Sequence, residues 1–167
     1  MKKNKLLFWI FLALTLAVDI FIIVNAFLNG EKSAAESNNF AQTTADVINA
    51  VKPETITPQN FDSFAFSIRK LVGHFGIFVV SGIFGTCTFS FLFCGLKSYL
   101  KTIVSSSSLT HGLFVAFCSE IIQKFVSGRS GNFTDVLIDF SGYLLGFLLT
   151  FVVLLLVLRK KQKQNQA

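Results

Sequence analysis

Charged residues are scarce in this chain of 167 residues. Asp, Glu, Lys and Arg together make up only 14% of it, whereas hydrophobic residues make up 52%. Soluble globular domains have about a quarter of their residues charged. The composition therefore excludes an ordinary soluble domain, and the length fits a single domain over residues 1–167.

Cysteine is also rare, and none of it lies in a polar segment. All three cysteines fall inside apolar stretches: Cys87, Cys94 and Cys118. We interpret them as small hydrophobic residues, since buried free cysteine packs like one. The sequence contains no recognised nucleophile motif and no diagnostic spacing of metal ligands, so it predicts no cofactor and no metal site. The alternative is a metal site formed by residues of the right ligand types: His74, Glu120, Asp135 and Asp139.

What the chain has instead is four apolar runs, each long enough to cross a membrane. A helix rises about 1.5 Å per residue, so about 20 apolar residues cover a hydrocarbon core of roughly 30 Å. Backbone polar groups cannot stay unpaired in lipid, so each run must be a helix. We expect an all-α integral membrane bundle with four transmembrane helices, at about residues 6–28, 75–96, 109–126 and 136–158.

Basic residues flank these runs at three places that share one side of the membrane, and Lys and Arg favour the cytoplasmic side. The pattern predicts a multi-pass cell-membrane protein with both termini cytoplasmic and membrane lipids as partners. The net charge of +6 therefore does not indicate nucleic-acid binding. A cleaved secretory signal is the alternative for the first run, which is longer than a typical signal core. The basic residues are Lys2, Lys3, Lys5, Lys97, Lys101, Arg159, Lys160, Lys161 and Lys163.

The outer loop over residues 29–70 is the only long polar segment. We expect its start, Glu31 to Asn39, to be flexible because it is rich in Glu, Ser and Asn. Hydrophobic residues then recur at helical spacing as far as Pro53, and again after Thr57-Pro58, which is typical of a helix start. The loop is predicted to contain short amphipathic helices that lie against the membrane.

Ionisable residues inside a span are costly, so they are usually paired or functional. Glu120 and Gln123 are three residues apart on the third run, and Asp135 and Asp139 begin a stripe on the fourth that continues with two glycines. Such glycines allow close helix packing. We predict a ligand-binding cluster near the outer surface, formed by Arg69, His74, Glu120, Gln123, Arg129, Asp135 and Asp139.

This pattern resembles the VanZ-like membrane proteins, whose namesake is associated with resistance to the lipoglycopeptide teicoplanin. There are two departures. Asp139 stands where the family commonly has Asn, and His74 follows Lys70 by four residues rather than three, which argues against Lys70 as the family's basic position and leaves Arg69 or neither. The resemblance implies a bacterial cell membrane and an effect at the cell surface. The matching stretches are Arg69–Phe75, Glu120–Gln123, Arg129, Asp135–Asp139, Gly142 and Gly146.

The leading hypothesis is a non-enzymatic protein that binds an anionic or amphiphilic group at the outer leaflet. Candidate ligands are a lipid-linked cell-wall intermediate and a lipoglycopeptide, with Arg69 and Arg129 gripping the anion. The alternative is an enzyme that modifies a lipid or cell-envelope headgroup, with His74 or Glu120 as general base.

A purely structural role for the cluster is a further alternative. In that case Glu120 would pair with Arg129, and Asp139 would be protonated or hydrogen-bonded to Gln123, so that the polar groups only join helices. Asp19, which lies in the first run outside the motif, is interpreted in the same way as an interhelical hydrogen-bonding group, as is Asn25.

Overall fold

The computed structural model describes residues 2–93 and 100–164, and these residues contain helices and no strand. The all-α prediction is confirmed. Outside the described part lie Cys94 and Lys97, and no side chain is described for Lys2, Lys3, Lys101 or the residues after Val157. The helices are α1 (Lys2–Ala26), α2 (Gly30–Val51), α3 (Phe61–Ile68), the π-helix η1 (Arg69–Gly76), α4 (Ile77–Leu92), α5 (Leu100–Lys124) and α6 (Phe133–Gln164).

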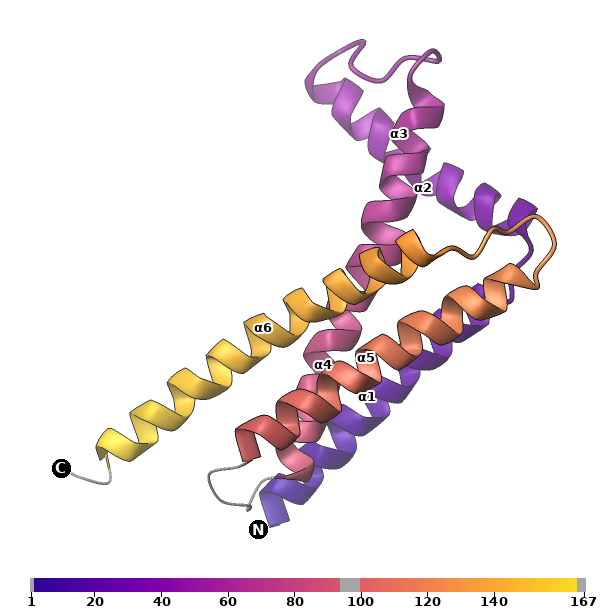
Figure 1. The fold of residues 1–167 in the computed structure, drawn as a ribbon. Helices are drawn as coiled ribbons and strands as arrows, with labels where there is room; N and C mark the ends of the chain where they lie inside the picture. The colour runs from indigo at the N-terminus through magenta and orange to yellow at the C-terminus, as the bar shows by residue number, and fades with distance from the viewer. Residues whose placement is uncertain (1, 94–99, 165–167) are drawn as a thin grey trace.

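Four long helices form the bundle, and α4 packs against each of the other three, α1, α5 and α6. The start of α1 and the end of α6 lie at one end of this bundle, whereas α2 and α3 lie at the other (Figure 1). The core that holds the helices together is apolar and includes Ile22, Phe78, Val115, Val136 and Phe147.

Among the described residues, three stretches are long and apolar enough to cross a membrane: Asn4–Ala26, Phe61–Leu92 and Phe133–Val157. The third predicted span falls on α5, which is not in this set. This helix begins at Leu100, nine residues before the predicted start, and its first half carries the serine run Ser105–Ser108, which lowers its hydropathy. Length and composition therefore support three of the four predicted spans.

The outer loop differs from expectation at two points. The stretch predicted to be flexible, Glu31 to Asn39, is helical, because α2 already begins at Gly30 and the Asn29 side chain accepts a hydrogen bond from Lys32 N at 2.9 Å. This is an N-cap, which satisfies a backbone donor that the helix leaves free. The predicted start at Thr57 is also wrong: α3 begins at Phe61 and runs without a break through η1 into α4.

Two glycines on α6 allow it to approach its neighbour closely. A Cβ atom at Gly142 would collide with the backbone carbonyl of Phe75, and one at Gly146 would collide with that of Val79. The stripe that begins with Asp135 and Asp139 thus continues as the contact face between α6 and the η1–α4 helix. This contact fixes how far the α6 carboxylates lie from η1.

Gly142→Leu should therefore lower the amount of folded protein in the membrane, because the inserted side chain has no space and overpacking typically costs about 1–3 kcal/mol. Ser141→Leu is the control, since the neighbouring Ser141 side chain is exposed. The measurement is the monodisperse peak in fluorescence-detected size-exclusion chromatography. Equal peaks for both variants would contradict this packing.

Candidate functional site

Two pairs of polar side chains connect η1 to α6 at matching intervals. Lys70 pairs with Asp135, and four residues further along both helices His74 Nδ1 lies 3.0 Å from Asp139 Oδ1. The π-helical turns of η1 carry both Lys70 and His74, and such turns inside a longer helix frequently occur at functional sites. The four-residue spacing between Lys70 and His74 thus matches the spacing of the two aspartates. Lys70 therefore belongs to the cluster, although the departure from the family spacing argued against it as the basic position.

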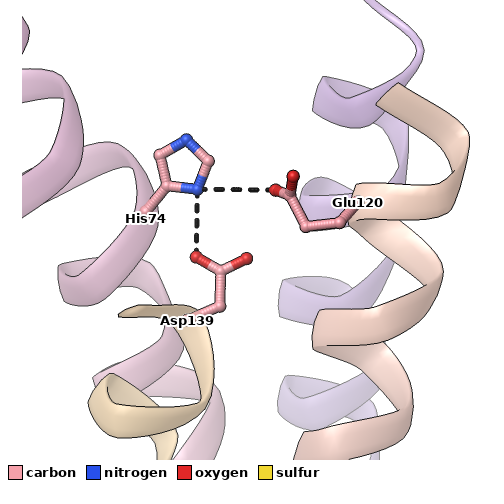
Figure 2. A group of neighbouring side chains, drawn as sticks. All are labelled: His74, Glu120 and Asp139. Atoms are coloured by element: carbon pink, nitrogen blue, oxygen red, sulfur yellow. Dashed lines mark hydrogen bonds and ion pairs between the residues drawn. The ribbon is translucent and has the colours of Figure 1, made fainter. Parts of the chain in front are cut away.

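His74 stands between two carboxylates from different helices (Figure 2). Its Nδ1 atom lies 3.0 Å from Asp139 Oδ1 on α6 and 3.7 Å from Glu120 Oε1 on α5. All three side chains are buried, and Asp139 is only 1% exposed. Its second oxygen, Oδ2, has no hydrogen-bond partner within the described part of the chain.

Glu120 is held in place by neighbouring donors. Gln123 Nε2 donates to Glu120 Oε1 at 2.9 Å, and the backbone N–H of Asn132 donates to Oε2 at 3.1 Å. Arg129 Nη1 in turn donates to Gln123 Oε1 at 3.1 Å. Arg129 therefore reaches Glu120 through Gln123, and the direct Glu120–Arg129 pair considered above is wrong. So is the Asp139–Gln123 bond, since Asp139 bonds to His74.

Arg129 caps the C-terminal end of α1 by hydrogen bonds to backbone carbonyls. Its Nη2 donates to Asn25 O at 2.7 Å and its Nε donates to Leu28 O at 3.1 Å. A cation at this position also complements the partial negative charge of a helix C-terminus. The Asn25 side chain donates to Phe21 O within its own helix, so it does not form the interhelical bond that the sequence suggested.

A cavity of about 510 Å³ opens beside this cluster, between α1, α2, η1, α4 and α5. Glu120 lies behind Gln123 and Asp135 pairs with Lys70, so these two do not line the cavity. The rest of its wall is largely apolar. Five of the seven predicted site residues line it: Arg69, His74, Gln123, Arg129 and Asp139.

The two arginines give the cavity a positive end. Burial lowers the pKa of the Arg129 guanidinium below its usual range, and the positive charge of Arg69 lowers it further. Arg69 points toward α2, where its Nε donates to Ser37 Oγ at 3.3 Å. Glu36, which also lines the cavity, partly offsets this positive charge.

The sequence reasoning missed a second polar network deeper in the bundle. Asp19 accepts from Ser81 at 3.1 Å and lies 2.9 Å from His111 Nε2, while Tyr143 OH lies 3.2 Å from His111 Nδ1 and 3.0 Å from Ser108 Oγ. Asp19 thus forms the interhelical bonds expected of it. The signal for His111 was the same one that identified Glu120, a polar residue within an apolar run.

This fold and cluster define an all-helical protein with helices suited to span a membrane, in which the buried ionisable groups of the described residues lie toward one end of the bundle. The chain belongs to the VanZ/LLP1 family, whose family model matches residues 8–156. The resemblance drawn from the motifs is confirmed, and the match covers nearly the whole chain. No curated protein and no solved structure matches it.

A double-mutant cycle should show that Lys70 and Asp135 interact. Lys70→Gln and Asp135→Asn should each lower thermal stability in detergent, and the double variant should lose less than the sum, with a coupling of about 0.5–3 kcal/mol. The control is a second cycle at the neighbouring residue. The stability losses of Arg69→Gln and Asp135→Asn should be additive, because Arg69 contacts Ser37 and not Asp135. Additivity in the Lys70 cycle would contradict the pairing.

Proposed function

We propose that this protein is a four-span cell-membrane protein that binds the anionic head of an amphiphile in the cavity at its outer surface. The observation that supports this proposal is the cavity, because its lining combines two arginines with apolar side chains. Its volume of about 510 Å³ falls in the range of small-molecule sites, roughly 300–1,000 Å³.

The packing of α5 supports the fourth span. It contacts α1, α4 and α6 along the bundle, and it exposes Phe114 and Phe117 on its outward side, as a helix facing lipid would. Several of its polar residues point the other way: Ser108, Ser119, Glu120 and Gln123 are buried. A helix of 25 residues is also long enough to cross a core of roughly 30 Å.

Orientation follows from where the basic residues lie. Lys5 lies in the first turns of α1, and further Lys and Arg residues follow the apolar part of α6, at the end of the bundle opposite to α2 and α3 (Figure 1). Basic flanks favour the cytoplasm, so both termini are cytoplasmic and the cavity faces outward.

Hydrogen-bond donors remain for an anion at the two arginines. A guanidinium carries five N–H groups. The hydrogen bonds of the described residues use one from Arg69 and three from Arg129, which leaves two or more on each. Planar N–H pairs of this kind suit a phosphate or carboxylate, and an anion would relieve the repulsion between the two cations.

The apolar wall suits the rest of an amphiphile. Phe21, Phe40 and Val72 line the cavity and are also exposed at the surface, so an acyl chain held there would continue into the surrounding lipid. The ligand class is thus an acyl-bearing anion of the outer leaflet, such as a lipid-linked cell-wall intermediate or a lipoglycopeptide. An effect on glycopeptide susceptibility is the expected consequence in cells.

Topology is testable with single cysteines in a background that lacks the three native ones. Cysteine at Asn38 or Ser130, both exposed and on the proposed outer side, should react with an impermeant thiol reagent on intact cells. Cysteine at Ser106, in the first half of α5, should react only after permeabilisation. Labelling of Ser106 on intact cells would refute the four-span topology.

Binding is testable with short-chain phosphatidylglycerol against phosphatidylcholine of equal length, by microscale thermophoresis of the purified protein. Arg69→Gln should weaken phosphatidylglycerol binding about tenfold or more, because a hydrogen bond to a charged group contributes about 1.5–3 kcal/mol. Arg129→Lys should weaken it through loss of the planar fork.

The matched control is Lys124→Gln, which removes one positive charge from the exposed end of α5, away from the cavity lining. It should leave the affinity within about twofold, since exposed charges are screened by salt. Equal affinity for the two lipids, or equal losses in Arg69→Gln and Lys124→Gln, would refute the cavity as an anion site.

A further inference from the structure

The cluster of His74, Glu120 and Asp139 has the donor set and spacing of a metal centre. One nitrogen of His74 and one oxygen from each carboxylate, supplied by three different helices, all lie within 4.8 Å of one another. Two ligands that are each about 2.1 Å from one ion in tetrahedral geometry lie roughly 3.4 Å apart. The two distances from His74 Nδ1, 3.0 and 3.7 Å, bracket this value.

The unpartnered Asp139 Oδ2 is an independent observation that points to a ligand. It is buried and without a hydrogen-bond partner in the described residues, although its carboxylate is turned toward His74 and Glu120 (Figure 2). A buried acceptor left unsatisfied costs about 1–3 kcal/mol. Coordination to a cation would remove that cost.

Charge balance favours a divalent ion. With neutral His74, the two carboxylates carry two negative charges into a buried site, and a divalent cation makes the group neutral. The nearby cations are engaged elsewhere: Lys70 pairs with Asp135, and Arg129 reaches Glu120 only through Gln123. The ion's charge would therefore be the main compensation for Glu120 and Asp139.

Groups around the cluster fix the orientation of Glu120, as outer groups do in established metal sites. Gln123 and the backbone of Asn132 each donate to one of its oxygens, so that Oε1 faces His74. His74 and Asp139 line the cavity, which gives an ion a route to them.

We propose that His74, Glu120 and Asp139 bind one divalent transition-metal ion of the Zn²⁺ or Mn²⁺ type. An imidazole with carboxylates suits these ions, whereas Mg²⁺ and Ca²⁺ prefer oxygen ligands alone. Binding through Nδ1 requires the neutral imidazole to carry its single proton on Nε2, so the proton that Nδ1 shares with Asp139 moves to Nε2 and the group with the ion stays neutral. This proposal does not depend on the amphiphile, since its ligands differ from the two arginines.

The test uses the full-length protein in detergent, with an affinity tag free of histidine. After treatment with EDTA and dialysis against Zn²⁺ or Mn²⁺, mass spectrometry of the metal content should give one ion per chain in the wild type. Asp139→Asn and His74→Gln should lose it, and Gln123→Leu should weaken binding about 10–100-fold as an outer group.

His111→Gln is the matched control, because His111 is a half-buried imidazole beside a single carboxylate, that of Asp19. It should retain the ion, as should Arg69→Gln, which separates this proposal from anion binding. Co²⁺ added to the stripped wild type should give a visible absorption band that Zn²⁺ abolishes, a readout that needs no variant to fold. A wild type without bound ion, or equal loss in His111→Gln, would overturn the proposal.

Discussion

The arrangement of this protein depends on keeping the Asp139 carboxylate buried in an apolar bundle. A carboxylate in such surroundings must be paired, neutralised or bound to a cation, because water is not there to solvate it. Asp139 meets His74 from η1, and His74 meets Glu120 from α5, so one group of side chains joins three helices. The close contact at Gly142 sets the spacing that makes this meeting possible.

The two polar networks of the bundle obey this constraint in different ways. Both oxygens of Asp19 have partners, and His111 uses both ring nitrogens, so the deeper network is closed. The outer cluster places two carboxylates around one nitrogen, opens to a cavity and leaves one oxygen without a partner in the described residues. We interpret the deeper network as helix packing and the outer cluster as the site.

Much of the helical architecture could be predicted from the sequence, because long apolar runs leave the backbone no alternative to a helix. It was also predictable that Glu120, Gln123 and Asp139 lie near the same end of the bundle, because each lies close to the outer end of its apolar run. The hydrogen-bond and ion-pair partners of these residues could not be predicted, because they depend on how each helix is rotated about its axis. The π-helical turns that align Lys70 with Asp135 have no sequence signature, and the carbonyls at the end of α1 that bind Arg129 are visible only once the helices are packed.

One buried polar atom of the outer cluster has no hydrogen-bond partner within the described chain, and this exception points to a function. In the rest of the described chain the buried side-chain polar atoms find partners, as Thr86 does with Ser108 and Glu120 does with Gln123. Asp139 Oδ2 does not within the described chain. An asparagine there could offer a donor at the same position, whereas the aspartate adds negative charge beside Glu120. Proteins keep such unfavourable groups chiefly where function requires them, and a cation is the ligand for which an added carboxylate is an advantage.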